Sequence, residues 1–332
     1  MKLCNFAIMG PGRIAEKFAG VFTLGLVPGA RLLGAASNSD PEKARVFAAA
    51  HHLERVYKNY PELLADPEVD IVYISTTNEK HYECCRQCIA AGKHMLCEKP
   101  LTPTAAEARD LEARAKAAGV FLMEGLWTRF LPGIQKASEW IEKGRIGEVC
   151  AMSLSICSNR DPKEFVRLYD KAMYGGALRD FGVYGLHMIR HFLKGKSLVK
   201  NAVSVVPSET GVDLSTFISL EYEGGSHASL QCSIGFEAQN NAFIYGSKGY
   251  IRIGPWFIAA MKAELFTEPF IKSNAPEDQK PSEIFIAPLS PGFEHEILHA
   301  ALCVGSGWTG SPVVTMEDTI AVIEFTEKVL RE

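Results

Sequence analysis

The stretch Cys4-Asn5-Phe6-Ala7-Ile8-Met9-Gly10-Pro11-Gly12-Arg13-Ile14-Ala15 decides the fold. Its apolar first half predicts a buried strand and the apolar spacing after it predicts a helix, so a G-x-G-x-x-A turn joins strand to helix. In that setting Gly10 permits a tight turn, Gly12 lets the backbone approach a pyrophosphate, and Ala15 lets the helix pack closely on the strand. The unpaired N–H groups at the helix start attract phosphate oxygens. The stretch therefore predicts a dinucleotide-binding turn.

Strand and helix patterns alternate through residues 1–125, which predicts an N-terminal Rossmann domain with a doubly wound parallel sheet. From residue 126 the pattern changes. Repeated short strands between 202 and 254, joined by glycine turns, predict a C-terminal α+β domain with a mostly antiparallel open sheet. We expect its helices at 131–143, 177–193, 293–304 and 316–331, and a loop at 274–280. The predicted fold class is α/β, with domains 1–125 and 126–332.

The composition of the 332-residue chain excludes several classes of protein. A hydrophobic share of 47%, a charged share of 22% and a net charge of −4 describe an ordinary globular protein with no basic surface for nucleic acid. No apolar run approaches the ~18 residues of a membrane span, and the N-terminal run is too short for a signal peptide. We therefore expect a cytoplasmic protein whose partners are neither nucleic acid nor membrane.

Nine cysteines are scattered along the chain, and Cys85 and Cys88 form a C-x-x-C pair. Such a pair can bind zinc or carry redox chemistry, but no second pair follows at zinc spacing and the segment has a helical pattern. We interpret the cysteines as small buried thiols in a reducing compartment. No other cluster has the spacing of metal ligands, so no metal is predicted.

A charged motif follows the apolar run at residues 93–97, which predicts a buried strand of the parallel sheet. The motif is Glu98-Lys99-Pro100, and the proline keeps Lys99 extended instead of helical. Open α/β sheets bind ligands at the carboxyl ends of their strands, so Lys99 is a candidate catalytic residue. The alternative is a surface turn, since charged residues are mostly exposed.

Polar residues also end the neighbouring strand at 69–75. Thr76, Thr77 and Asn78 follow it, and their hydroxyl and amide groups can line the nicotinamide side of a cofactor site. His81 stands at the start of the helix expected at 81–91. We interpret His81 as a residue of the cofactor site and helix start, not as the catalytic base.

The strand at 31–37 ends in Asn38 and Ser39, where an NAD-specific Rossmann domain usually has an acid that binds the ribose 2′-OH. Asn38 carries no charge and so does not repel a 2′-phosphate, and Ser39 can donate a hydrogen bond to one. Arg13 is the nearest candidate cation, together with Lys43. The sequence therefore predicts a modest preference for NADP, with NAD still usable.

Five motifs follow one another along the chain with characteristic spacing. They are Gly10-Pro11-Gly12, Thr76-Thr77-Asn78 with His81, Glu98-Lys99-Pro100, residues 175–184, and Gly292-Phe293-Glu294-His295-Glu296-Ile297. Together they resemble the glucose–fructose oxidoreductase / inositol dehydrogenase (Gfo/Idh/MocA) family. Residues 123–130, taken with Asp180 and Tyr184, are similar to its branch of dimeric dihydrodiol dehydrogenases and xylose-type sugar dehydrogenases.

The resemblance implies an NAD(P)-dependent dehydrogenase of a sugar, polyol or cyclic diol, acting on CH–OH groups or on the CH–CH group of a trans-dihydrodiol. Residues 1–125 would bind the cofactor. Residues 126–332 would bind substrate and form a homodimer through the open sheet, whose exposed face we expect to carry residues such as Phe217, Ile218, Leu230 and Ile234. Two departures from the family pattern are Thr77, in place of a common proline, and Asn38-Ser39, in place of the Ser-Arg pair of NADP-using members.

The resemblance assigns catalysis to Lys99, Asp180 and Tyr184, with tyrosine standing where inositol dehydrogenases have histidine. Tyr184 follows Asp180 by four residues, so on an α-helix both side chains share one face. We expect the phenol to exchange the substrate hydroxyl proton, helped by the Lys99 ammonium. Asp180 would position the hydroxyl or Lys99, and Glu98 would hold the loop or contact the cofactor.

Trp127, Arg129 and Phe130 follow the last strand of the first domain. They can line a substrate pocket, where aromatic faces suit a sugar ring or an aromatic diol, or they can pack as core. The rival to an enzyme is a non-catalytic, dinucleotide-binding regulator of the same fold. Such a regulator would be expected to lose Lys99 or Asp180, and both are present.

Overall fold

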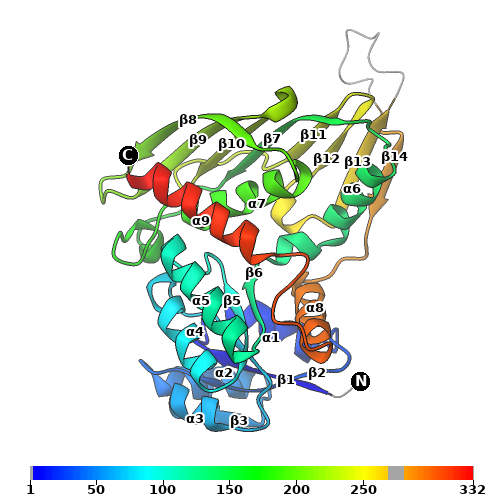
Figure 1. The fold of residues 1–332 in the computed structure, drawn as a ribbon. Helices are drawn as coiled ribbons and strands as arrows, with labels where there is room; N and C mark the ends of the chain where they lie inside the picture. Colours follow the sequence, from blue (N-terminus) through cyan, green and yellow to red (C-terminus); the bar gives the residue numbers. More distant parts are fainter. Residues whose placement is uncertain (1–2, 268–279, 332) are drawn as a thin grey trace. The chain divides into compact units, whose positions relative to one another are not determined.

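The computed structural model of the protein describes residues 3–267 and 280–331. Contacts divide the chain into two compact units, Met1–Trp127 with Pro291–Glu327 and Thr128–Ser290 with Lys328–Glu332. Figure 1 labels the elements of both. Residues 274–279 of the predicted loop lie outside the described residues.

The first unit contains a six-stranded sheet in the order β3-β2-β1-β4-β5-β6, with every neighbouring pair parallel (Figure 1). The doubly wound Rossmann sheet is therefore confirmed. The strand order reverses between β1 and β4, the place where such sheets bind nucleotides. The strands are β1 (Cys4–Met9), β2 (Ala30–Ala36), β3 (Arg55–Tyr57), β4 (Ile71–Ile74), β5 (His94–Glu98) and β6 (Leu122–Gly125).

The helices of this unit begin and end largely where their sequence signals predict. Asp40 caps α2 by accepting the Lys43 N–H, and Thr104 with Glu107 forms a capping box at the start of α5. The helices are α1 (Arg13–Thr23), α2 (Pro41–Ala50), α3 (Tyr60–Ala65), α4 (His81–Ala90), α5 (Ala105–Ala118), α8 (Phe293–Gly305) and α9 (Met316–Arg331), of which the last enters the second unit at its end.

Helix α8 and most of α9 belong to the first unit, although the sequence analysis grouped them with residues 126–332. Their packing explains why. Helix α8 contacts α1 and β2, and Ile320 and Ile323 of α9 join the apolar core beside the sheet. The roles assigned to 1–125 and 126–332 stay predictions.

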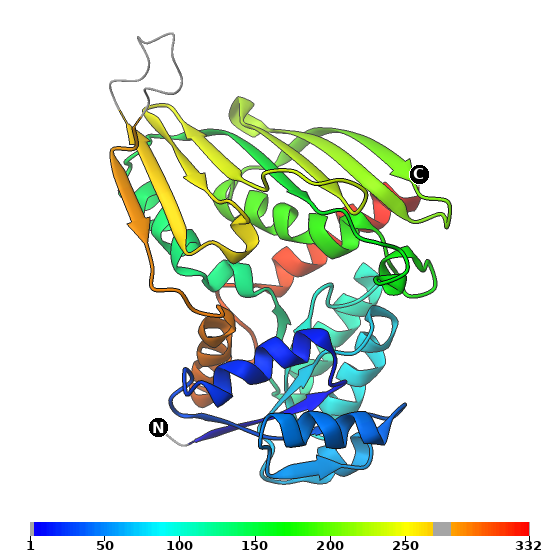
Figure 2. The ribbon, with the colours of Figure 1, turned by 180° about the vertical axis from the view of Figure 1, so that it is seen from behind.

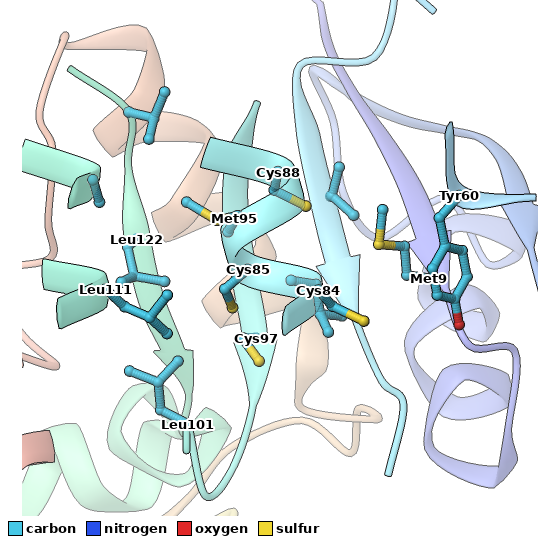
Figure 3. Packing of buried hydrophobic residues seen from close by; sticks show 14 of the residues in the cluster. Met9, Tyr60, Cys84, Cys85, Cys88, Met95, Cys97, Leu101, Leu111 and Leu122 are labelled. Atoms are coloured by element: carbon cyan, nitrogen blue, oxygen red, sulfur yellow. The ribbon is translucent and has the colours of Figure 1, made fainter. Parts of the chain in front are cut away.

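Figure 3 shows the core between the sheet and helices α4 and α5, where sulfur atoms gather. The cysteines of this core are fully or almost fully buried, and they are Cys84, Cys85, Cys88 and Cys97. Burial raises the pKa of the Cys84 thiol to about 12 and that of the Cys88 thiol well above its usual value. Thiols with such pKa values are inert packing groups. Within the described ranges, no three His, Cys, Asp or Glu side chains are arranged to hold a metal ion.

The second unit is built on an eight-stranded sheet in the order β14-β13-β12-β11-β7-β10-β9-β8. The pairing of β7 with β10 is parallel and the other pairs are antiparallel, so the predicted mostly antiparallel sheet is confirmed. The sequence analysis missed β13 and β14. The strands are β7 (Val149–Cys157), β8 (Leu198–Pro207), β9 (Asp213–Tyr222), β10 (His227–Ser233), β11 (Ala242–Gly246), β12 (Gly249–Ile253), β13 (Lys262–Thr267) and β14 (Glu283–Ile286).

Helices α6 (Pro132–Glu142) and α7 (Val183–Phe192) lie along one face of this sheet, as Figure 2 shows from behind. No described helix of this unit lies over the opposite face, where Phe217 is 39% exposed. The sequence analysis also placed Ile218, Leu230 and Ile234 on the open face, which was wrong because all three are buried. Successive strand residues point to opposite faces, so Phe217 and Ile218 cannot share one.

Among the described residues, no helix combines the length and apolar character that crossing a membrane requires.

Candidate active site

The glycine turn lies where the strand order of the first sheet reverses. Gly10 has φ +86°, and a Cβ there would lie 2.8 Å from the Thr76 side chain, so only glycine lets the β1 and β4 ends approach this closely. Helix α1 has Gly12 as its N-cap and no side-chain cap, so no side chain competes for the N–H groups of its first turn. A Cβ at residue 12 would meet only the Gly10 carbonyl oxygen, at 3.8 Å. Open space and uncapped N–H groups fit the pyrophosphate of a dinucleotide.

Asn38, the residue predicted to lie at the adenosine end of the cofactor site, comes just after β2. Its Oδ1 accepts a 2.8 Å hydrogen bond from the Tyr60 backbone N–H, which turns the amide N–H groups away from Tyr60. Asn38, Ser39 and Arg13 are all exposed, and the first two directly follow Ser37. Asp40 follows Ser39 and caps α2, and the tolerance of this strand end for a 2′-phosphate stays a prediction.

His81 joins the turns that follow β4 and β5. Its Nδ1 lies 2.9 Å from the Pro100 carbonyl oxygen and its Nε2 lies 3.2 Å from that of Thr76. Thr77 and Asn78 lie between these anchors, and Asn78 is buried. The imidazole therefore holds the two turns together through backbone atoms. Whether any of these side chains also contacts the cofactor stays a prediction.

The β5 end carries the Glu98-Lys99 pair. Glu98 is the last residue of the strand and is buried, and its Oε1 accepts a 2.5 Å hydrogen bond from the Tyr73 hydroxyl. Its Oε2 accepts the Lys99 backbone N–H at 3.2 Å. Burial raises the pKa of Glu98, while the Tyr73 bond and the Lys99 charge oppose that rise. Lys99 follows at the carboxyl edge of the sheet, half-buried, with a cis peptide to Pro100.

Sequence reasoning did not single out another buried acid of this unit, Glu296 on the first turns of α8. It is fully buried, and neither carboxyl oxygen has a hydrogen-bond partner among the described residues. Burial, and then the neighbouring Glu98 charge, raise the pKa of Glu296 well above its usual value. The motif at residues 292–297 was the available signal. That motif identified the helix, but it did not reveal that Glu296 is buried near the charge of Glu98.

In the second unit, Asp180 and Tyr184 lie on consecutive but different turns. Residues Leu178–Gly182 form a π-helical turn, and α7 begins only at Val183. The sequence analysis expected one α-helix from residue 177. The argument that Asp180 and Tyr184 share one face assumed α-helical geometry, which the π turn does not have. Tyr184 is buried at 7% exposure. Isolated π turns occur often at functional sites.

Two residues that the sequence analysis did not single out hold this turn. Arg167 donates a 2.8 Å bond from Nη2 to Asp180 Oδ1. Asp213, at the start of β9, accepts the Leu178 N–H at 2.7 Å and the Thr216 hydroxyl at 2.8 Å through Oδ2. Burial raises the pKa of Asp213 to about 6. Arginine and aspartate lie far from Asp180 in sequence, so no spacing rule could have found them.

The predicted pocket residues are divided between the units. Trp127 belongs to the first and stacks on Phe293, with ring centroids 4.8 Å apart and 12° between planes. Arg129 belongs to the second, is 5% exposed, and donates to His191 Nδ1 at 2.9 Å. Phe130 is buried at 8% exposure. These are packing contacts within each unit, and a role in a substrate pocket stays a prediction.

Two family models match the chain. Residues 4–126 match "Oxidoreductase family, NAD-binding Rossmann fold", and residues 134–252 match "GFO/IDH/MocA C-terminal domain". Among curated relatives, the trans-1,2-dihydrobenzene-1,2-diol dehydrogenase of Sus scrofa is 31% identical over 329 residues, which cover 98% of this chain and 95% of the relative. The enzyme of that name from Homo sapiens is 30% identical over 327 residues, with 98% and 95% covered.

Solved structures are similar over the whole chain. An aldose-aldose oxidoreductase from Caulobacter crescentus, complexed with glycerol, has a TM-score of 0.86 at 24% identity, with 100% of this chain and 97% of the other covered. A 3-ketoreductase from Actinomadura kijaniata, in complex with NADP and TDP-benzene, has a TM-score of 0.83 at 25% identity, with 98% and 96% covered. The first likeness concerns the fold alone.

Proposed function

Because the chain belongs to the Gfo/Idh/MocA family of oxidoreductases and carries its NAD-binding Rossmann domain, we propose that this NAD(P)-dependent dehydrogenase acts on a cyclic diol or a sugar. The name shared by the curated relatives supports a trans-diol of a six-membered ring. The sugar alternative rests on the resemblance of residues 123–130, Asp180 and Tyr184 to xylose-type sugar dehydrogenases. The observation that carries the proposal is the uncapped glycine turn at the strand-order reversal, in the same sheet whose strand β5 is followed by the half-buried Lys99.

The residues of the first unit would bind and orient the cofactor. Backbone N–H groups of Arg13, Ile14 and Ala15 would hold the pyrophosphate, and the Thr76–Asn78 turn would flank the nicotinamide. Bound NAD(P) supplies the hydride acceptor or donor. Lys99 would place a positive charge at the carboxyl edge of the sheet, where it stabilises negative charge on a substrate oxygen. Glu98 fixes the backbone of Lys99 through the bond to its N–H.

The residues of the second unit would handle the proton. When an alcohol is oxidised, the hydrogen on carbon leaves as hydride with both electrons of the C–H bond. The proton of the hydroxyl group must pass to a base. We assign that proton to the Tyr184 hydroxyl and the orientation of the substrate hydroxyl to Asp180. Trp127, Arg129 and Phe130 are proposed to limit which ring the enzyme accepts.

The open face of the second sheet supports a homodimer. Aromatic side chains gather there, with Tyr250 stacked on Phe266 at 4.3 Å and Tyr245 38% exposed. A hollow of about 570 Å³ lies beside them, lined by serines and by Phe217 and Phe243. Monomers seldom expose an apolar area of this kind, so we propose that a second copy of the chain covers it.

A substrate scan tests the proposed function. The purified protein is mixed with NADP or NAD and with trans-dihydrodiols, aldoses and polyols, and the absorbance of the reduced nicotinamide is followed. We expect turnover of at least one diol or sugar. Binding of both cofactors without turnover of any compound in either direction would overturn the proposal and favour a dinucleotide-binding regulator.

A further inference from the structure

Asp180 lies on a turn whose position is fixed from outside the turn. Asp213 caps its first N–H at Leu178, and Gly176 immediately before it has φ +110°. A Cβ at residue 176 would lie 2.0 Å from Asp213 Oδ1, so the glycine is required for the cap to approach. The backbone that carries Asp180 is therefore held in place, but these contacts leave the carboxylate itself to rotate about its side-chain bonds.

Arg167 contacts the Asp180 carboxylate directly. It lies in the 3-10 turn Val166–Tyr169. The backbone of that turn is bonded to Gly176, whose N–H donates to the Leu168 carbonyl oxygen at 2.8 Å. The Tyr169 hydroxyl donates to the carbonyl oxygens of Arg160 at 2.7 Å and Ile234 at 3.2 Å. The guanidinium thus comes from a braced turn and not from a free loop.

The bond between the two side chains is better suited to orientation than to stability. Arg167 Nη2 meets Asp180 Oδ1 at 2.8 Å, with 36% of the arginine side chain and 14% of the aspartate side chain exposed. Ion pairs with one exposed partner contribute only about 0–1 kcal/mol to folding. The charge-assisted bond from the guanidinium does, however, restrict where Asp180 Oδ1 can lie.

We infer that Arg167 is a positioning residue of the active site, which holds Asp180 Oδ1 so that Oδ2 faces the substrate hydroxyl. Two neighbouring arginines lie over aromatic rings. Arg160 lies over the Phe165 ring at 4.9 Å, and Arg179 lies over the Tyr174 ring at 5.3 Å. The inference rests on the proposed function, because it assumes that Asp180 orients the substrate.

The first test compares Arg167→Met, Arg167→Ala and Arg167→Lys with wild type on the substrate found by the scan. A misoriented catalytic group typically costs up to about 100-fold. We expect Arg167→Met to lower kcat by roughly 10- to 100-fold while the Kd for the cofactor, measured by fluorescence titration, is unchanged. Arg167→Lys should recover only part of the rate, because an ammonium lacks the planar fork. Added guanidinium ion should partly rescue Arg167→Ala.

A matched control comes from the same unit. Arg145 pairs with Glu283 at 3.1 Å, with 40% and 37% of the side chains exposed, and neither residue belongs to the proposed site. Arg145→Met should leave kcat unchanged. If both methionine variants lower kcat equally, or if guanidinium ion does not rescue Arg167→Ala, Arg167 is merely structural and the inference is overturned. If Arg167→Met does not fold, the lysine variant and the rescue of the alanine variant decide.

A double-mutant cycle separates this inference from the proposed function. Asp180→Asn should lower kcat strongly, and adding Arg167→Met to it should cause little further loss, since the arginine acts through Asp180. If the kcat loss of the double variant equals the product of the two single losses, the positioning role of Arg167 is overturned while the proposed function stands. If Asp180→Asn and Tyr184→Phe both keep wild-type kcat, the proposed function itself fails.

Discussion

The Tyr73 hydroxyl donates a 2.5 Å hydrogen bond to Glu98 Oε1, one residue before Lys99. Tyr73 lies on β4 and stacks on Phe18 of α1, with ring centroids 3.6 Å apart. One aromatic ring therefore connects the helix that starts at the glycine turn to the strand that ends at the lysine. Because Glu98 also accepts the Lys99 N–H, the position of Lys99 depends on a buried carboxylate and its phenol donor.

Tyr73→Phe should destabilise the protein while keeping the aromatic stack. The substitution leaves a buried acceptor without its donor, which typically costs about 1–3 kcal/mol. Urea unfolding followed by fluorescence measures this loss. Tyr82→Phe is the control, since the Tyr82 hydroxyl donates to Asp110 near the surface and should matter less. An equal loss in both variants would contradict the importance of the Glu98 bond.

Glu296→Gln should stabilise the protein, and increasingly so as the pH rises. Burial raises the folded-state pKa of Glu296 well above its usual value, so the folded state holds a proton that the unfolded state has lost. Stability from this group is complete below the unfolded pKa of about 4.3 and is lost as the pH rises toward the folded pKa, at about 1.4 kcal/mol per unit of separation. Glutamine stays neutral and avoids that loss.

The measurement is the free energy of unfolding of both proteins from pH 4.5 to 8.5. The difference should be small at the acid end and should grow with pH. Glu317→Gln, on the exposed first turn of α9, is the control and should show no such trend. A Glu296→Gln variant that is less stable than wild type throughout this range would mean that the carboxylate is ionised and bonded in the fold.

The regular elements were predictable because they depend on local spacing, whereas the contacts that hold the site were not. The strand at residues 4–9 and the helix at 105–118 follow from apolar period and capping residues, and both are present. Arg167 and Asp213 act through contacts with residues 13 and 35 positions away, and the burial of Glu296 follows from the packing of α8, so none of the three depends on local spacing. The π turn at 178–182 was not predicted either, because its residues fit an α-helical pattern equally well.

Lys99→Ala should abolish most of the catalysis and leave cofactor binding intact. The pyrophosphate is assigned to backbone N–H groups at the start of α1, which the substitution does not touch. Acid–base and charge contributions are typically worth ~10²–10⁴-fold, so kcat should fall by that order. Turnover and fluorescence titration of the reduced cofactor measure the two properties. Lys116→Ala, on the exposed side of α5, is the control. A near-native kcat in Lys99→Ala would show that Lys99 is not a catalytic residue.

Charges placed on the open face of the second sheet should dissociate the proposed dimer. Phe217 and Tyr245 are 39% and 38% exposed on that face, and a symmetric interface would bury each of them twice. The double variant Phe217→Asp, Tyr245→Asp should elute as a monomer by light scattering, while wild type is a dimer at micromolar concentration. Val46→Asp, at a 55% exposed position on α2, should stay dimeric. A monomeric wild type would contradict the assembly.

Asn38→Asp should reverse the preference for cofactor. In the wild type, Asn38 Oδ1 accepts the Tyr60 N–H at 2.8 Å, and an aspartate oxygen can accept the same bond. The substitution therefore keeps the turn and adds one negative charge beside the ribose. That charge accepts a hydrogen bond from a 2′-OH and repels a 2′-phosphate, which disfavours NADPH. Arg13, exposed at the start of α1, is the cation that would favour the phosphate in the wild type.

Fluorescence titration of NADH and NADPH against both proteins measures the preference. We expect wild type to bind NADPH more tightly by a modest factor and Asn38→Asp to bind NADH more tightly. Asn201→Asp is the control, since Asn201 is exposed on β8 of the second unit and the substitution adds a charge outside the proposed cofactor site. Arg13→Gln should lower NADPH affinity more than NADH affinity. A wild type that clearly prefers NADH would show that the neutral residue after β2 binds two ribose hydroxyls and that Arg13 does not compensate a phosphate charge.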